Sequence, residues 1–135
     1  MSIPTKTVKQ LTRLARKASA RAYSPYSNFR VGAALVSQSG AMFSGCNVEN
    51  ASYGLTNCAE RTAIFSMVAA GETNFEAIVV YTPTETPTAP CGACRQVLFE
   101  FNPEAEVISI CEGTEVRRTL VRDLLPGAFG PKSLT

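Results

Sequence analysis

The chain has 135 residues, of which 45% are apolar and 18% charged, so the sequence predicts one domain over residues 1–135 with a buried core and excludes wholesale disorder. Its formal net charge of +2 is too small for the basic footprint of a nucleic-acid-binding protein, and no apolar run approaches the roughly 18 residues of a membrane span. The chain contains no histidine, which excludes Ser-His-Asp and Cys-His catalysis and any histidine-ligated metal.

The first half of the chain predicts a surface helix, a β-hairpin and a second helix. Apolar residues at helical spacing over residues 5–22, with basic residues mostly on the other faces, indicate a helix capped by Thr5. Residues 31–36 predict a buried strand whose small residues indicate close packing, and residues 41–48 return as its partner. The next helix is expected to begin around Cys58 and to end at Gly71, a typical residue after a helix C-terminus.

The second half of the chain predicts strands that alternate with helices. Strands are expected over residues 76–81 and 106–111, on either side of a helix that runs from Pro90-Cys91 to Asn102-Pro103. A last strand over residues 116–120 leads into a short helix over residues 121–125. This alternation predicts an α/β fold with a central sheet covered by helices on both faces.

Five cysteines carry the strongest chemical signal. Their odd number and the lack of an export signal disfavour a disulfide framework and favour a metal site or buried thiols in a cytoplasmic protein. Cys91 and Cys94 occupy the first turn of a helix, a spacing from which both can bind one tetrahedral zinc ion as thiolates. Cys58 opens another helix and supplies a third ligand, which leaves the fourth zinc position for water, as in catalytic sites.

Glu60 stands two residues after Cys58 and is the candidate acid–base group. From that position its carboxylate can reach a water molecule on the metal without binding the metal itself. The alternative is a helix capping box, in which Asn57 is the N-cap and Glu60 bonds to the backbone.

Two other interpretations stay open on these residues. If Cys46 were a fourth ligand, the site would be closed and the protein would be a structural zinc module. If Cys91 and Cys94 were a redox pair, the protein would be a thioredoxin-like oxidoreductase, but Cys58 and Glu60 would then have no role. Apart from these roles, Cys46 and Cys111 are expected to be small buried side chains.

The pattern Cys58-Ala-Glu60 followed by Pro90-Cys91-Gly-Ala-Cys94 resembles the zinc-dependent nucleobase deaminases. It is most similar to the short, all-cysteine, homotetrameric cytidine deaminases, through further matching stretches at residues 26–29, 31–34, 45–50, 58–63, 90–96 and 124–129. The resemblance implies a three-layer α/β/α sandwich around a mixed five-stranded sheet. It also implies a cytoplasmic enzyme of pyrimidine salvage that hydrolyses cytidine and 2′-deoxycytidine to uridine and 2′-deoxyuridine plus ammonia.

The same resemblance implies one Zn²⁺ per subunit, a small nucleoside substrate, and a homotetramer with shared active sites, with neither nucleic acid nor membrane as partner. Cys58, Cys91 and Cys94 would bind zinc and Glu60 would transfer the proton. Asn47 and Glu49 would bind the ribose, chiefly its 3′-hydroxyl, and the backbone of Ala51 and Tyr53 would complete the sugar pocket. Phe29 would pack on the nucleoside, and the amide of Ala59 and the carbonyl of Ala89 would contact the base edge. Phe129 of a neighbouring subunit would cover the pyrimidine.

A site of three thiolates carries one more negative charge than a site with one neutral ligand. The extra charge weakens the metal as a Lewis acid, so a nearby cation is expected to compensate. Arg61 lies in the same helical turn as Cys58 and could donate hydrogen bonds to the sulfurs of Cys58 and Cys91, oriented by Gln96 or Arg95.

Overall fold

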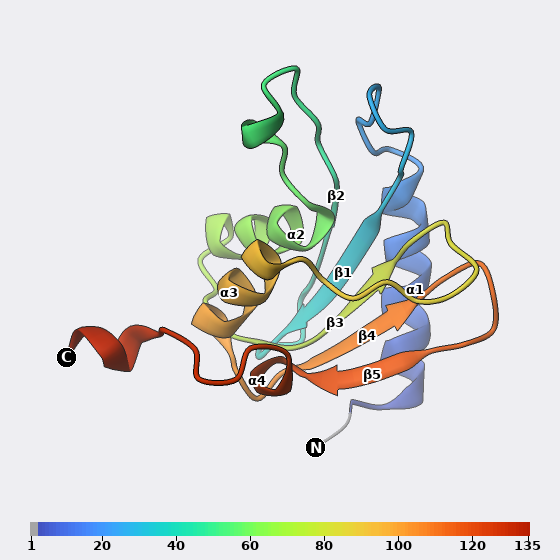
Figure 1. Cartoon of the computed structure of the whole chain (residues 1–135). Helices are drawn as coiled ribbons and strands as arrows, with labels where there is room; N and C mark the ends of the chain where they lie inside the picture. The colour runs from blue at the N-terminus through green and yellow to red at the C-terminus, as the bar shows by residue number, and fades with distance from the viewer. Residues whose placement is uncertain (1–2) are drawn as a thin grey trace.

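The computed structural model describes residues 3–135, and Figure 1 shows the course of the chain. No helix in that range is both long and apolar enough to cross a membrane. In chain order the elements are α1 (Thr5–Ser19), β1 (Gly32–Ser37), β2 (Met42–Cys46), the short 3₁₀ helix η1 (Tyr53–Leu55), α2 (Ala59–Ala69), β3 (Phe75–Tyr81), α3 (Gly92–Phe101), β4 (Glu106–Ile110), β5 (Arg117–Leu120), α4 (Val121–Leu124) and the 3₁₀ helix η2 (Pro131–Leu134).

The five strands form one mixed sheet in the order β2-β1-β3-β4-β5. Only β3 and β4 are parallel, because α3 connects them as a crossover, and the other three neighbouring pairs are antiparallel. The predicted mixed five-stranded sheet is confirmed.

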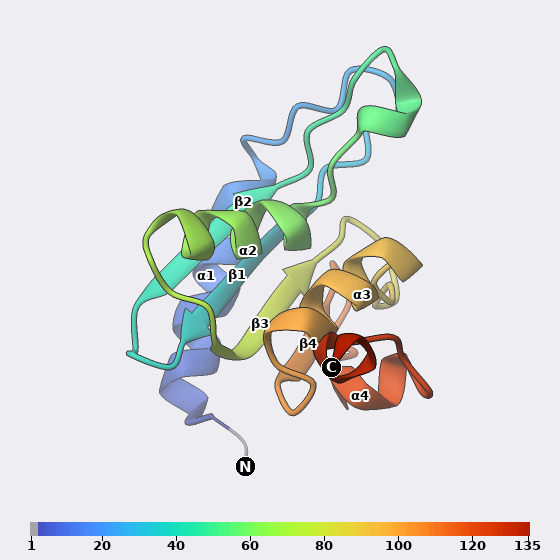
Figure 2. The same cartoon turned by 90° about the vertical axis from the view of Figure 1, so that its left-hand side faces the viewer.

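Each face of the sheet has its own apolar core, which confirms the three-layer arrangement (Figures 1 and 2). Side chains alternate across the sheet, so Ile78 and Val80 of β3 pack with α2 and α3, whereas Ala77 and Val79 pack with α1 on the opposite face. The two cores fix α2 and α3 on the same side of the sheet.

Several element ends differ from the sequence prediction. The first helix ends at Ser19 instead of residue 22. Thr5 does not cap this helix but is its first helical residue, because Pro4 is the N-cap, and no side chain caps the helix. Gly71 follows α2 with the positive φ of 92° that favours glycine. The sequence analysis did not predict η1 and η2, which are too short to show an apolar period.

Residues 22–31 and 47–57 form an arm that extends beyond one end of the sheet (Figure 2). The amide of Tyr23 donates to the carbonyl of Asn47 at 3.0 Å, and the amide of Glu49 donates to the carbonyl of Tyr23 at 2.8 Å. Near the tip, the rings of Tyr26 and Tyr53 meet edge to face with centroids 5.9 Å apart. The arm thus brings together two segments that lie on either side of the β1–β2 hairpin in the sequence.

Two glycines set how closely helices approach the sheet. A Cβ atom on Gly32 would lie 1.8 Å from the carbonyl oxygen of Ala15 in α1. A Cβ atom on Gly45 would lie 2.5 Å from the amide nitrogen of Ala63 in α2. Both contacts are with helix backbone, which cannot move aside as a flexible side chain can.

Replacement of Gly32 by alanine is therefore expected to destabilise the fold by about 1–3 kcal/mol or more, since the new methyl group forces α1 away from β1. The free energy of unfolding from urea titration measures the effect. Gly54→Ala is the matched control, because nothing lies within 4 Å of a Cβ atom there. Equal unfolding midpoints for the two variants would contradict the prediction.

Candidate active site

Three cysteines meet where the N-termini of α2 and α3 lie together. Cys58 and Cys91 are the N-cap residues of the two helices, and Cys94 lies in the first turn of α3. Their sulfur atoms all lie within 4.8 Å of one another, with Cys58 Sγ and Cys91 Sγ 3.7 Å apart. Tetrahedral Zn–S bonds of about 2.3 Å would place the sulfurs about 3.8 Å apart, so the cluster fits a zinc ion.

The thiols are poised to carry negative charge. Hydrogen bonds from Cys94, the larger effect, and from Arg61 together lower the pKa of Cys58 to about 5. The same interaction raises the pKa of Cys94, since its proton is shared with the neighbouring thiolate. Negative charge therefore settles first on Cys58, at the start of a helix whose dipole stabilises it, and a divalent cation would draw the remaining thiols into the thiolate form.

Arg61 contacts the cluster at Cys58, one of the two sulfurs that the charge argument named; within residues 3–135 no hydrogen bond joins it to Cys91. Its Nη2 donates to Cys58 Sγ at 3.4 Å, and the pKa of Arg61 is raised by this bond. Gln96 and Arg95 have other partners: Gln96 donates to the carbonyl of Phe129, and Arg95 donates to the carbonyls of Pro90 and Leu124. Among residues 3–135, neither of them hydrogen-bonds to Arg61.

Glu60 is buried beside the thiols, with an exposed fraction of 5%. Burial raises the pKa of its carboxyl to about 7, and the charge on Cys58 acts in the same direction. The capping-box alternative is wrong, because Cys58 is the N-cap of α2 with no side-chain cap, and Asn57 donates instead to the hydroxyl of Thr62 at 3.1 Å. A buried carboxyl that titrates near neutral pH suits proton transfer.

A cavity of about 270 Å³ lies between the three-thiol cluster and the arm. Of the residues that the sequence analysis names, Cys58, Ala59, Glu60, Ala89 and Cys91 line it from the helix N-termini, and Phe29, Asn47 and Glu49 line it from the arm. Ser27, Val31, Thr56, Val80, Thr82 and Thr88 also line it. The sequence analysis gave none of these six residues a role, although Ser27 and Val31 lie in stretches that match the family. No motif marked the other four, because only the tertiary structure brings them to the cavity.

The side chains of Asn47 and Glu49 are held by the backbone of the arm. Asn47 donates through Nδ2 to the carbonyl of Phe29 at 2.7 Å and accepts through Oδ1 from the amide of Val31 at 2.9 Å. Glu49 accepts from the amides of Tyr26 and Ser27 through Oε1, and from the hydroxyl of Ser27 through Oε2. These bonds fix one amide and one carboxylate at the edge of the cavity.

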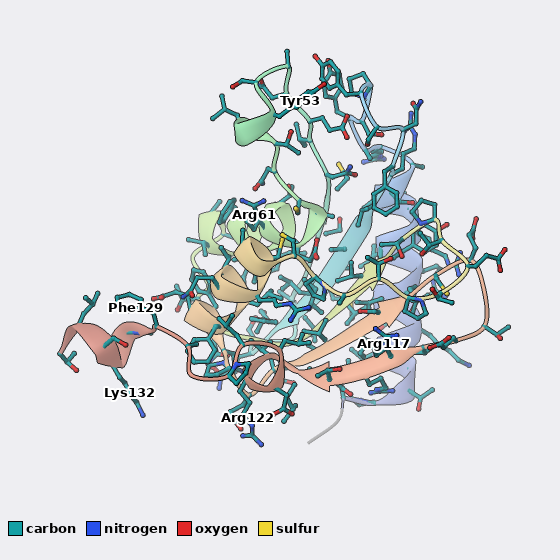
Figure 3. All side chains as sticks on the ribbon, viewed as in Figure 1. Tyr53, Arg61, Arg117, Arg122, Phe129 and Lys132 are labelled. Atoms are coloured by element: carbon teal, nitrogen blue, oxygen red, sulfur yellow. The ribbon has the colours of Figure 1, made fainter. Side chains whose placement is uncertain are left out.

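Three of the predicted substrate contacts lie outside the cavity of their own subunit. Ala51 and Tyr53 belong to the tip of the arm, where Tyr53 is 75% exposed. Phe129, 59% exposed, lies on the C-terminal segment away from the arm (Figure 3). These positions do not contribute to the cavity within one chain.

The remaining two cysteines stand apart from the cluster. Cys46 is half-buried and does not belong to the three-thiol group, so it is no fourth ligand there. Cys111 is buried, as expected, and its thiol donates to the carbonyl of Glu85 at 3.3 Å. The geometry also disfavours a redox pair of Cys91 and Cys94 alone, because the sulfur of Cys58 lies 3.7 Å from that of Cys91, the separation expected for two ligands of one metal ion.

The family model for the cytidine and deoxycytidylate deaminase zinc-binding region matches residues 5–110. This chain belongs to that family. The cytidine deaminase of Sporosarcina psychrophila is 46% identical over 129 residues, which are 95% of each chain. That of Halalkalibacterium halodurans is 49% identical over 110 residues, covering 80% of this chain and 83% of the relative.

Solved structures of family members agree with the fold. The crystal structure of cytidine deaminase from Burkholderia pseudomallei superposes with a TM-score of 0.87 at 56% identity, covering 90% of this chain and 98% of that one. Cytidine deaminase from Mycobacterium tuberculosis gives a TM-score of 0.78 at 39% identity, covering 91% and 97% of the two chains. The family resemblance found in the sequence is confirmed.

The Arg61–Cys58 hydrogen bond leads to a test of the charge argument. We expect Arg61→Ala to weaken zinc binding by about 10- to 100-fold, because the thiolate of Cys58 loses its cationic donor. Competition of the purified holoprotein with a chelator at several pH values measures this, and zinc should be lost at a higher pH than from the unsubstituted protein. Arg117→Ala, which removes an exposed arginine of β5 (Figure 3), is the matched control.

A double-mutant cycle of Arg61→Ala with Cys58→His distinguishes charge compensation by Arg61 from the simple loss of one hydrogen bond. A neutral imidazole removes the extra negative charge, so Arg61→Ala should cost less zinc affinity in that background. Strictly additive effects on zinc affinity would show that Arg61 does not balance the third thiolate.

Proposed function

We propose that this protein hydrolyses cytidine and 2′-deoxycytidine to uridine and 2′-deoxyuridine plus ammonia, with one zinc ion per subunit. The observation that carries the proposal is the buried carboxyl of Glu60 beside the three-thiol cluster, in the same cavity as Asn47 and Glu49. The reaction suits the needs of pyrimidine salvage.

Glu60 moves the protons of the reaction. A zinc ion held by Cys58, Cys91 and Cys94 would supply the Lewis acidity that makes water nucleophilic at neutral pH. The Glu60 carboxylate accepts a proton from the water that attacks C4 of the pyrimidine and delivers it to N3. It then takes the remaining proton of the new C4 hydroxyl and gives it to the 4-amino nitrogen, so that the C4–N bond breaks, ammonia leaves and the C4 carbonyl of the uracil forms. A pKa of about 7 lets this carboxyl both accept and donate near neutral pH.

The base and the sugar are bound from opposite sides of the cavity. Ala59 opens α2, so its amide has no partner within the helix and can donate to the base edge, while the carbonyl of Ala89 accepts from it. Phe29 packs on the nucleoside. Asn47 can donate and Glu49 can accept, so together they bind one sugar hydroxyl, the 3′-hydroxyl, which ribose and 2′-deoxyribose share.

The charges around the cavity favour an uncharged nucleoside. The lining contains the carboxylates of Glu49 and Glu60, and none of the lining residues is lysine or arginine. A phosphorylated nucleotide or a polynucleotide would bring negative charge next to these carboxylates without a cation to bind it. The substrate is therefore a free nucleoside.

The assembly that completes the site is a homotetramer in this proposal. Phe129 is exposed and its carbonyl accepts a hydrogen bond from Gln96, which presents the ring on the C-terminal segment away from its own arm. Tyr53 and Leu55 at the arm tip are 75% and 69% exposed, as apolar side chains at an interface would be in a single chain. In this proposal Phe129 covers the pyrimidine of a neighbour, and the enzyme works in the cytoplasm, where its free thiols stay reduced.

Replacement of Glu60 by glutamine tests the reaction itself. We expect the variant to keep its fold and its zinc and to lose about 10²- to 10⁴-fold in kcat, because the amide cannot shuttle protons. The fall in absorbance as cytidine becomes uridine gives the rate, and atomic absorption gives the zinc content. Glu100→Gln on the exposed face of α3 is the matched control. Near-normal turnover with Glu60→Gln would rule out the mechanism.

The shared site can be tested by mixing two variants that are each impaired at a different residue of the site. Phe129→Ala should lower kcat/KM in every site of its own tetramer, and Glu60→Gln should abolish proton transfer. Hybrid tetramers formed from both chains should regain activity, because some sites combine an intact Glu60 with an intact Phe129 from a neighbour. Light scattering measures the mass of the assembly. In the control mixture, the exposed-site variant Val116→Ala takes the place of Phe129→Ala. A fully active monomer would contradict the shared site.

A further inference from the structure

Ser27 lines the cavity and donates two hydrogen bonds to Glu49, although the sequence analysis gave this serine no role of its own. Its hydroxyl donates to Glu49 Oε2, and its amide donates to Glu49 Oε1 at 3.2 Å. The same hydroxyl accepts from the amide of Phe29 at 3.0 Å. Ser27 therefore connects the carboxylate of Glu49 to the backbone of the residue that packs on the nucleoside.

We propose that Ser27 is a positioning residue for the sugar, which holds the Glu49 carboxylate so that only a hydroxyl that donates a hydrogen bond is accepted there. This inference rests on the proposed nucleoside substrate and adds a specificity-determining side chain to the same site.

The turn that carries Ser27 is fully hydrogen-bonded, so it can act as a rigid support. The amide of Tyr26 donates to Glu49 Oε1 at 2.9 Å, and the amide of Asn28 donates to the carbonyl of Ser24 at 2.9 Å. Asn28 has a φ of 57°, a left-handed conformation that asparagine tolerates better than most residues. Every amide from Tyr26 to Phe29 thus has a partner, and two of the four amides donate to the same oxygen, Oε1 of Glu49.

A count of donors and acceptors shows what this arrangement selects. A carboxylate has about four acceptor positions, and three of those on Glu49 are filled by Tyr26 and Ser27. The one hydrogen of the Ser27 hydroxyl is committed to Glu49, and one of its two lone pairs is committed to Phe29. The capacity that remains on both side chains is acceptor capacity, so a ligand atom placed here must donate.

The charge of Glu49 supports the same role. The hydrogen bond from the Ser27 hydroxyl is the largest of the effects that lower the pKa of this carboxyl. A carboxylate that stays ionised accepts a stronger hydrogen bond from a sugar hydroxyl than a protonated carboxyl would. Without the Ser27 hydroxyl, Oε2 of Glu49 would lose its hydrogen-bond donor from this turn, and the carboxylate would lose part of this stabilisation.

The test compares Ser27→Ala with the unsubstituted holoenzyme on cytidine, 2′-deoxycytidine and 3′-deoxycytidine. On cytidine and 2′-deoxycytidine we expect kcat/KM to fall about 10- to 100-fold, mainly through KM, because a charge-assisted hydrogen bond that orients the sugar is lost. On 3′-deoxycytidine the two proteins should have the same kcat/KM, since the hydroxyl that Glu49 accepts is missing from the substrate. Ser27→Thr, which keeps the hydroxyl, should restore the loss on cytidine.

The chain offers a matched control for this pair. Ser39 Oγ donates to Glu72 Oε1 at 2.7 Å and accepts from the amide of Ala41, a second serine–glutamate pair that does not line the cavity. Ser39→Ala should leave all three substrates unaffected. An equal loss on all three substrates with Ser27→Ala, no loss on any of them, or a loss that disappears with 2′-deoxycytidine instead would overturn the proposal. Failure of the unsubstituted enzyme to deaminate cytidine would instead overturn the proposed function.

Discussion

The structure depends on bringing three sulfur atoms within bonding distance of one ion. Two of them, from Cys58 and Cys91, are N-cap residues of different helices, so the helices must begin at the same place. The parallel pairing of β3 and β4 fixes the crossover that carries α3, and Gly45 lets the backbone of α2 lie against β2. Because both helix N-termini point at the cluster, their dipoles favour the thiolates that metal binding requires.

Negative charge is concentrated at this point in the fold. The Glu60 carboxyl is almost fully buried next to the Cys58 thiol, an arrangement that costs free energy in a purely structural core. Arg61 is the cation that contacts the cluster, and it comes from the same turn of α2 as the groups that it serves. One helical turn therefore carries a candidate metal ligand, the proposed proton carrier and a counter-charge, which explains why a short motif contains so much of the proposed chemistry.

The opposite side of the cavity is built by different physical means. The arm has few buried apolar side chains, and its conformation rests on hydrogen bonds from Asn47 and Glu49 to the backbone of residues 26–31. The side chains that would bind the sugar are thus the same ones that hold the arm in place. Packing of two apolar cores positions the metal end, whereas polar contacts position the sugar end.

The sequence by itself determined the order of the long elements and predicted that three thiols would meet beside Glu60 and Arg61, because apolar period, cysteine spacing and charge balance are local properties of the chain. Only the tertiary structure decided that Cys46 lies outside the cluster, that Gln96 bonds to the C-terminal segment, and that Ser27 supports Glu49. These contacts join residues far apart in the sequence, and strand pairing and helix packing bring them together. No local pattern encodes such distances.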